Sequence, residues 1–249
     1  MEVHKHPHHV THPKKWTEYL LEFFMLFLAV FLGFIAENIR ENSVEHHREK
    51  QFIRSLMNDI KADTARIKNI INQRTIRERR LDSLTFLLNS NSNTVHTNII
   101  YYYAVTPARL IAFRFIPNDG TMQQLKNSGA FRLIRNRAVV DSIGKYDGSL
   151  RNFQRQGEIE ETLVQDYRAA SAFIFDALVF DRILDTDNNV RMPTENPALL
   201  PYDKRDLHAW NYKMYSMKSI NKASRRDARL FLQQAENLLE TLKKEYNLE

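Results

Sequence analysis

The chain has 249 residues, and 36 Lys and Arg against 30 Asp and Glu give a formal net charge of +6. Hydrophobic residues make up 43% and charged residues 27%, as in globular proteins, and the 6 Gly and 7 Pro exclude a collagenous or linker-like chain. The absence of Cys excludes thiol catalysis, disulfides and thiolate zinc sites. A dense apolar stretch near the N-terminus raises the question of a membrane location.

The N-terminal tail, residues 1–15, is rich in histidine. His4, His6, His8 and His9 lie within six residues of one another, and such tracts can bind a divalent metal. Prolines in the tail oppose a helix, and no carboxylate fixes the imidazole rings. We therefore prefer a solvated tail and keep the four histidines as a candidate metal site.

Residues 16–38 are predicted to form a transmembrane helix. Between Tyr19 and Ala36 only Glu22 is charged, and 18 residues at about 1.5 Å each just cross a hydrocarbon core. Seven consecutive apolar residues, 23–29, suit lipid better than a buried core helix, which is the alternative. Because no small-residue cleavage site follows, the segment should remain attached as a signal anchor.

The orientation of this helix rests on a near balance of flanking charge. Three lysines precede the helix, and four cations follow it within about 20 residues. Lys14 and Lys15 abut the helix directly, and a long C-terminal domain can cross a membrane largely regardless of its charges. We therefore expect a single-pass protein of the cell membrane, with a cytoplasmic N-terminus and the C-terminal domain on the outer side.

One face of the predicted membrane helix carries small and acidic residues. Helical geometry places Glu22, Ala29, Gly33 and Glu37 within about 80° of one another, whereas the phenylalanines lie on the other side. Small residues let a second helix approach closely, and acids at either end avoid lipid by facing a partner. The pattern predicts a homo-oligomer or a membrane protein partner. In the alternative, both acids lie at the headgroup level and Gly33 is incidental.

A stalk helix is predicted over residues 39–92. Apolar residues recur at heptad-like spacing from Ile53 to Leu88, which is typical of a coiled coil, and Asp63, Arg74 and Arg77 occupy slots where apolar residues are expected. A polar loop rich in Asn and Ser follows. The pattern indicates a coiled-coil-like stalk with polar interruptions.

Residues 93–249 are predicted to form a helical bundle packed with the stalk. A helix followed by a loop is expected within 99–116, although the strand propensity of this stretch leaves strands as the alternative. A short helix capped by Asp119 or Thr121 should follow and stop at Gly129. The remaining expected elements are a long helix over 137–183, an irregular connection over 185–201 and a last helix over 203–246. Because all long elements are helices, we predict an all-α fold in which an N-terminal transmembrane helix continues into a stalk helix with an antiparallel bundle.

The core face of the helix over 137–183 is predicted from its apolar spacing. It comprises Val140, Ile143, Leu150, Phe153, Ile159, Leu163, Tyr167, Ala170, Ile174 and Leu178. Glu160 and Glu161 are adjacent on this helix and therefore diverge, which is unsuitable for acid/base work on one substrate.

No catalytic pattern emerges from the remaining residues. The chain has no phosphate-binding Gly loop, no Gly-x-Ser-x-Gly elbow and no His-Glu-x-x-His motif, so we expect neither an enzyme nor a cofactor. Basic clusters around Arg77, Arg135 and Arg226 lie beside acidic residues, as on helix faces with many ion pairs. We therefore expect no nucleic-acid binding. An anionic ligand or headgroup is the functional alternative for these cations.

Several short stretches near the N-terminus form a recognisable pattern, namely Lys14-Lys15-Trp16, Glu22-Phe23, Gly33-Phe34-x-Ala36-Glu37 and Arg48-Glu49-Lys50-Gln51, and a later one is Gln124-Leu125-Lys126-x-Ser128-Gly129. With these stretches the chain resembles a family of uncharacterised bacterial single-pass membrane proteins. The resemblance is close over about the first 55 residues and patchy beyond them. It implies a helical extramembrane domain on an N-terminal anchor and supplies no activity. Lys5 and Pro7 interrupt a His tract that relatives tend to keep continuous.

Two functions remain open from the sequence. The preferred one is a membrane-anchored helical scaffold or interaction protein that self-associates, with the lipid bilayer as its first partner. The alternative is a single-span sensory or ligand-binding module for an anionic or small ligand. The tail of about 15 residues is too short for a signalling output domain, which favours the scaffold.

Overall fold

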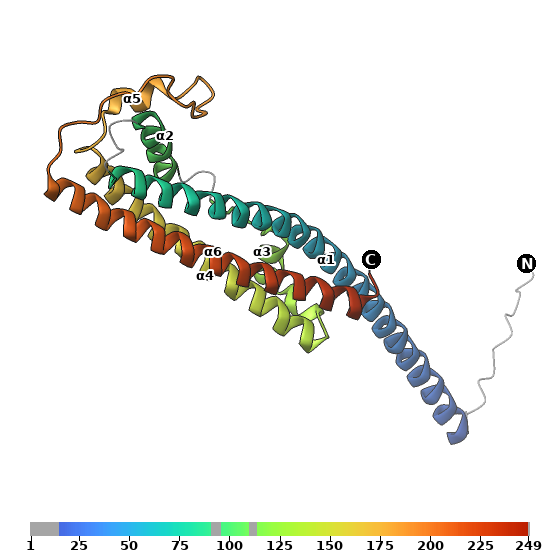
Figure 1. Cartoon of the computed structure of the whole chain (residues 1–249). Helices are drawn as coiled ribbons and strands as arrows, with labels where there is room; N and C mark the ends of the chain where they lie inside the picture. Colours follow the sequence, from blue (N-terminus) through green and yellow to red (C-terminus); the bar gives the residue numbers. More distant parts are fainter. Residues whose placement is uncertain (1–14, 91–95, 110–113, 249) are drawn as a thin grey trace, which may run out of the picture. The chain divides into compact units, whose positions relative to one another are not determined.

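The computed structural model describes residues 15–90, 96–109 and 114–248 and confirms the predicted all-α fold (Figure 1). Within these ranges the only strand-like pairing is an isolated bridge between Leu184 and Val190. The helices are α1 (Trp16–Leu88), α2 (Thr97–Ala108), α3 (Gly120–Asn127), α4 (Arg137–Ser171), α5 (Ala177–Arg182) and α6 (Lys204–Tyr246), with a 3-10 helix η2 at Ala130–Leu133.

The chain divides into two units, one up to Gln51 and one from Phe52 to Glu249. The first unit contains the N-terminal part of α1. Here the large apolar side chains are exposed, and the apolar segment of α1 is long enough to cross a membrane and has none of its residues buried. Because α1 contains no Pro and only Gly33 as a weak helix former, it continues into the predicted stalk without a break.

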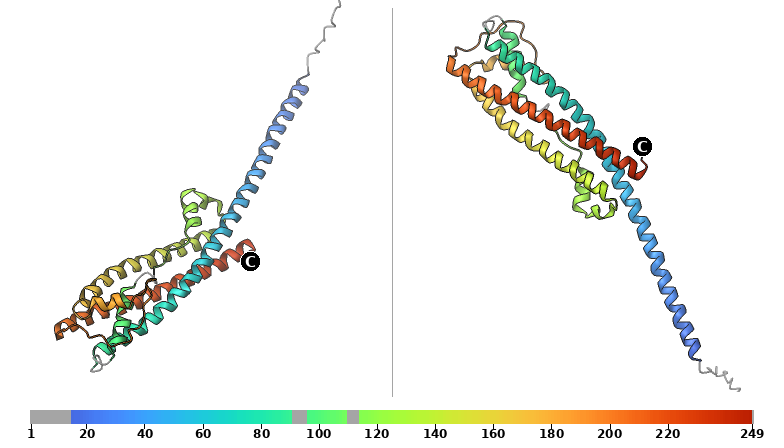
Figure 2. Two further views of the ribbon diagram at one scale, coloured as in Figure 1. Left: turned by 90° about the horizontal axis from the view of Figure 1, so that it is seen from above. Right: turned by 60° about the horizontal axis from the view of Figure 1, so that its bottom comes forward.

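Three long helices build the second unit: α1 from Phe52 onward, α4 and α6 lie side by side in both views of Figure 2. α6 runs antiparallel to α1, as three cross-helix contacts show: Lys68 with Glu236, Asp82 with Lys218, and Asn89 with Asn211. α6 is also antiparallel to α4, as three further contacts show: Asn136 with Glu245, Asp166 with Lys213, and Ser171 with Trp210.

α1 and α4 run in the same direction, which the predicted antiparallel arrangement did not include. Asp63 contacts Tyr146, and Arg74 contacts Glu160, so contact positions rise together along both helices. A parallel pair requires the intervening chain to return along the bundle. The segment between α1 and α4, which contains α2 and α3, therefore makes this return.

Two hydrophobic clusters fill the bundle. One lies around Ile60, Phe153 and Phe231, and the other around Leu84 and Trp210. Between them along α1 lie Arg74 and Arg77, which are about 1% exposed. Together with Glu160, Asn221 and Ser224, all at most 1% exposed, they form what we call the polar layer. The predicted polar interruptions of the stalk are therefore buried.

Asp63 is the third polar residue that the sequence placed in an apolar slot of the stalk, and its hydrogen bonds connect α1 with α4 and with the segment before α3. Its carboxylate accepts hydrogen bonds from the Tyr146 hydroxyl at 3.0 Å and from the Asn118 backbone N–H at 3.0 Å. Burial raises the pKa of Asp63, and these hydrogen bonds oppose the increase. Burial likewise raises the pKa of Tyr146, so its hydroxyl stays protonated and can donate.

The helix predicted over 137–183 is two helices, and its predicted extent was wrong. α4 ends at Ser171, and α5 starts again after Asp176, whose side chain accepts from the Leu178 N–H at 2.9 Å. An N-cap of this kind starts a new helix in a new direction. The last helix agrees with its prediction, because Asp203 and Asp206 form a reciprocal capping box at the start of α6.

The start of α3 differs from the predicted cap. Asp119 occupies the N-cap position, yet its side chain makes no capping hydrogen bond and instead accepts from the Gln123 side chain at 3.0 Å. Gly129 ends this region with a φ of 67°, a left-handed conformation that favours glycine. α3 itself ends at Asn127, two residues before the predicted stop at Gly129, and Gly129 precedes η2.

Two residues of the core face predicted for the helix over 137–183 are exposed in the structure. Ile159 is 45% exposed, and Leu178, which belongs to α5, is 68% exposed. Glu160 and Val164 lie in the interior instead. The interior stripe follows Tyr146, Leu150 and Phe153 at heptad spacing, and continuing that spacing brings Glu160 inward.

Candidate functional site

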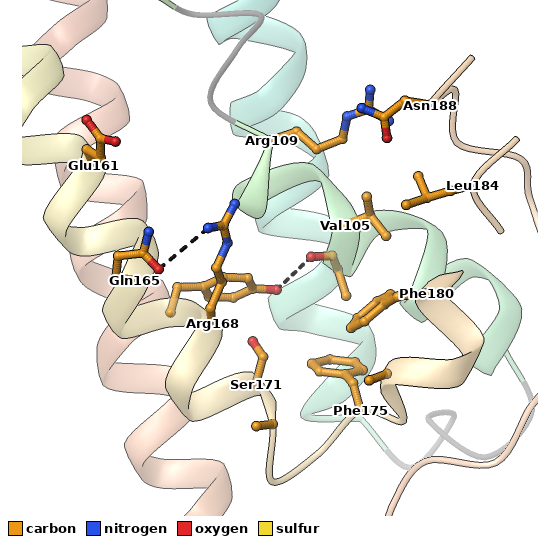
Figure 3. A pocket seen from close by; sticks show the side chains of 14 residues that line it. Val105, Arg109, Glu161, Gln165, Arg168, Ser171, Phe175, Phe180, Leu184 and Asn188 are labelled. Atoms are coloured by element: carbon orange, nitrogen blue, oxygen red, sulfur yellow. Dashed lines mark hydrogen bonds between the residues drawn. The ribbon is translucent and has the colours of Figure 1, made fainter. Parts of the chain in front are cut away.

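A cavity of about 790 Å³ lies among α2, α4, α5 and the segment after α5 (Figure 3). Its size is within the range of small-molecule sites, which are concave and mostly apolar with a few placed polar groups. The surface is mainly apolar and includes Val105, Phe175 and Phe180. Arg109, Gln165, Arg168 and Asn188 supply polar groups at its margin.

Tyr101 fixes the walls of this cavity, although it does not line it. Its hydroxyl accepts from the Asp176 N–H at 2.9 Å and donates to the Ala198 carbonyl at 3.0 Å, so it joins α2 to the chain on both sides of α5. Its ring meets Phe175 and Phe180 edge to face at 5.6 and 5.5 Å. The two phenylalanines are therefore held in place on the cavity wall.

The inner wall is made by Tyr167 and Ser171 of α4. The Tyr167 hydroxyl donates to the Ala104 carbonyl at 2.9 Å, and Ser171 Oγ accepts from Trp210 Nε1 at 3.2 Å. Burial raises the pKa of Tyr167, so this wall stays neutral at physiological pH. The interior of the cavity thus presents aromatic faces and hydroxyls that already have hydrogen-bond partners.

Two arginines lie at separate places on the margin of the cavity. Figure 3 shows Arg109 beside Asn188 and Arg168 beside Gln165, whereas Phe175 and Phe180 lie close to each other on another part of the wall. Arg168 donates to Gln165 Oε1 at 3.5 Å, a long and weak hydrogen bond. Within the described ranges, Arg109 has no ion-pair partner. The cavity is therefore amphipathic, with cations at its margin and aromatic rings in its interior.

The polar layer adjoins the cavity through α2. Arg77 Nη2 donates to the Pro107 carbonyl at 3.2 Å, close to where Tyr167 bonds to Ala104. Arg77 also pairs with Glu160. Pro107 lies in the last turn of α2, where a helix leaves carbonyl groups without intrahelical partners, so the Arg77 guanidinium satisfies one of these groups.

Glu160 is the single carboxylate of the polar layer and serves both guanidinium groups. Arg74 approaches it with two N–H donors, at 2.8 and 3.3 Å, and Arg77 pairs with the same group. Burial raises the pKa of Glu160, but attraction to the two arginines outweighs burial and leaves the pKa below its ordinary value. Burial lowers the pKa of Arg77, which Glu160 opposes. The layer therefore contains two cations and one anion out of solvent.

A second cavity, of about 450 Å³, opens onto the same layer. It is lined in part by Arg74, Arg114 and Glu160, together with Glu158 and Glu161. Because three carboxylates and two guanidiniums share this lining, its charge selects no ligand class. The larger cavity is the better candidate for a binding site.

The predicted site residues are not brought together in the described structure. His4, His6, His8 and His9 lie outside the described residues. In the part of the chain that the structure does describe, no three His, Asp or Glu residues form a group that could hold a metal ion.

The predicted packing face of the membrane segment lies on α1. Glu22, Ala29, Gly33 and Glu37 are all exposed, and a Cβ added at Gly33 would meet no atom within 4 Å. Glu37 pairs with Arg40 at 2.8 Å, so this acid has a partner within its own helix. Whether this face packs against a second helix stays a prediction.

Sequence reasoning missed the larger cavity and the role of Glu160. The one available signal was the pair of arginines in heptad core slots, which requires a buried acid on a facing helix. Comparison of the chain with protein-family models, curated protein sequences and solved structures finds no match.

Proposed function

We propose that this chain is a single-pass membrane protein that anchors a helical interaction module, with its N-terminus cytoplasmic and its C-terminal domain on the outer side. The proposal is carried by the apolar segment of α1, whose side chains are exposed around the whole helix. A soluble surface rarely exposes so large a continuous apolar patch, whereas a bilayer covers it. Membership of the bacterial single-pass family remains a prediction that agrees with this proposal.

The full chain is expected to stay with membranes through an alkaline carbonate wash, because an 18-residue apolar helix buries far more surface than peripheral contacts do. A chain starting at Asn42, which keeps the entire second unit, should be soluble. The measurement is immunoblotting of pellet and supernatant. Release of the intact full chain into the wash would reject the anchor.

Intact spheroplasts test the orientation of the chain in the membrane, because the positive charges on the two sides of the membrane helix are nearly equal in number. Protease added to spheroplasts should digest the chain beyond Glu37 and leave the tail and the membrane helix. Protection until the membrane is permeabilised would reverse the proposed orientation.

Self-association through the small face of α1 is the proposed form of interaction. Gly33→Leu should weaken it, since a Leu side chain would hold two backbones apart, and Phe27→Leu, about 120° away from Gly33 on the helix, should not. Each close contact contributes on the order of 1 kcal/mol in membranes, so the monomer-oligomer balance should shift about fivefold. The measurement is energy transfer between labelled chains in vesicles. Equal behaviour of the two variants would remove any packing role of this face.

A second function, ligand binding by the bundle, is favoured by the 790 Å³ cavity. An amphipathic cavity with pre-positioned aromatic walls has the character of a binding site. Cross-linking of a photoreactive ligand to the cavity walls, and its loss when Ala172→Trp fills the cavity, tests this function. Ala172 is suited to this purpose because it lines the cavity yet is exposed, so the substitution spares the core.

A further inference from the structure

We infer that the larger cavity binds a neutral, largely apolar small molecule and discriminates against charged ones. This inference rests on the proposed ligand-binding function and names its ligand class. It follows from three features of the lining: an aromatic wall that is held in place, inner polar groups that already have partners, and charged groups that lie apart from one another at the margin (Figure 3).

The aromatic wall is built from rings that hold one another. The centroids of Phe175 and Phe180 lie 5.7 Å apart, with the two rings tilted by 43°, and Tyr101 meets each of them edge to face. Trp210 packs against Phe175 at a centroid distance of 6.2 Å. Phe175 therefore contacts three other rings, and the wall is formed before a ligand arrives. An apolar ligand can bind to such a wall with little loss of side-chain freedom.

The polar atoms of the inner wall have hydrogen-bond partners within the protein. The Tyr167 hydroxyl donates to the Ala104 carbonyl at 2.9 Å, and Ser171 Oγ accepts from Trp210 Nε1 at 3.2 Å. These hydroxyl groups therefore do not require a polar ligand atom. A sugar or a nucleotide would lose its hydrogen bonds to water at this wall without replacement, whereas an apolar molecule has none to lose.

The charged groups of the lining do not converge on one point. Figure 3 shows Arg109 beside Asn188, Arg168 beside Gln165, and Glu161 at a third place. Arg168 donates to Gln165 at 3.5 Å and takes part in a further interaction within the protein. Glu161 and Arg168 are also exposed and therefore hydrated. A charged ligand would lose its own hydration in the apolar interior without gaining a matched partner there.

The test uses the full chain in phosphatidylcholine nanodiscs and three photoreactive probes built on one trifluoromethyl-phenyldiazirine skeleton. The para group is methyl in the neutral probe, carboxylate in the anionic probe and aminomethyl in the cationic probe. The probes are compared at equal free concentration in the aqueous phase, which is set by dialysis. Mass spectrometry of the cross-linked peptides separates binding in the cavity from partition into the disc.

The neutral probe is expected to label peptides that contain Phe175 or Phe180, with unlabelled para-xylene competing. Each charged probe should label the same peptides at least about tenfold less, because burial of an unmatched charge costs at least that factor in affinity.

Two matched pairs of variants accompany the probes. Ala172→Trp fills the cavity and should abolish the competed labelling, whereas Ala169→Trp, at an exposed alanine of α4 outside the lining, should stay within about twofold of the parent chain. Phe180→Ala removes one ring of the wall and should lower neutral labelling about threefold to tenfold. Phe173→Ala is its control, since Phe173 is 62% exposed and lies outside the lining. Circular dichroism checks that all variants remain helical.

Each contrary result has a distinct meaning. Labelling by a charged probe that equals labelling by the neutral one, and is lost in Ala172→Trp, would keep ligand binding and reject the neutral ligand. Equal neutral labelling of Phe180→Ala and Phe173→Ala would reject the aromatic wall as the ligand contact and overturn the inference. No competed labelling by any probe would reject ligand binding as well. Labelling by a phosphatidylcholine with a diazirine in its acyl chain, with no competition by para-xylene, would assign the cavity to a lipid tail and overturn the small molecule.

Discussion

Replacement of Glu160 by Gln should lower the free energy of unfolding of the bundle by about 3–5 kcal/mol, the usual cost of breaking a buried ion pair by removing one partner. Glu160 is the single anion beside two buried guanidinium groups, and it accepts two hydrogen bonds from Arg74 and pairs with Arg77. The amide keeps the shape of the side chain and removes its charge. The measurement is urea unfolding of the chain that starts at Asn42.

Glu161→Gln is the matched control, since it makes the same chemical change one position along the same helix on an exposed side chain. It should change the unfolding free energy by about 0.5 kcal/mol or less. If the two variants were equally stable, Glu160 would not neutralise the layer.

The Glu160 effect should depend on pH. The pKa of Glu160 is lower in the folded chain than its ordinary value of 4.5, so folding favours the ionised form. This contribution is complete above pH 4.5 and is lost as the pH falls through the folded pKa. The stability difference between the parent chain and Glu160→Gln should therefore narrow below pH 4.5. A difference that stayed constant would show that the charge of Glu160 is not responsible.

Trp210→Ala should destabilise the bundle by about 3–5 kcal/mol, because truncation of a buried aromatic residue loses its burial and leaves a cavity. Trp210 is fully buried, packs against Tyr167 and Phe175 at ring distances of 6.0 and 6.2 Å, and donates to Ser171. All three neighbours line the larger cavity. The loss should therefore also loosen the cavity wall, measurable as weaker probe labelling.

Tyr212→Ala provides the control on the same helix. Tyr212 is 67% exposed, so its truncation should cost about 0.5 kcal/mol or less in urea unfolding. A loss at Trp210 no larger than at Tyr212 would mean that the packing around the indole ring contributes little to stability.

Much of the helical fold could be predicted from the sequence, and the reasons are local. α1 lacks Pro and keeps one apolar spacing from Ile53 to Leu88, and α6 begins at a strong cap formed by Asp203 and Asp206. The helix over 137–183 was extended too far because Ile174 continues its apolar spacing past the real end. The break depends on the cap at Asp176, which a spacing argument does not weigh.

The candidate site could not be predicted because it is made by contacts between distant residues. Arg77 and Glu160 are 83 positions apart in sequence, and their pairing requires that α1 and α4 pack side by side with these two positions at the same level. The cavity depends on the placement of α2 and α5 against α4, and each is too short to have a strong apolar pattern of its own. Arg109 and Arg168 line one cavity only because α2 and α4 pack against each other.

The order in which the helices leave the ribosome has a consequence for how the bundle is made. α6 contributes Phe231 to one hydrophobic cluster and Trp210 to the other, and it is the last of the described helices to be synthesised. Until it emerges, the parallel pair of α1 and α4 has no third helix to cover its apolar stripes. Neither cluster can close during translation, so the nascent chain should depend on chaperones that shield those stripes.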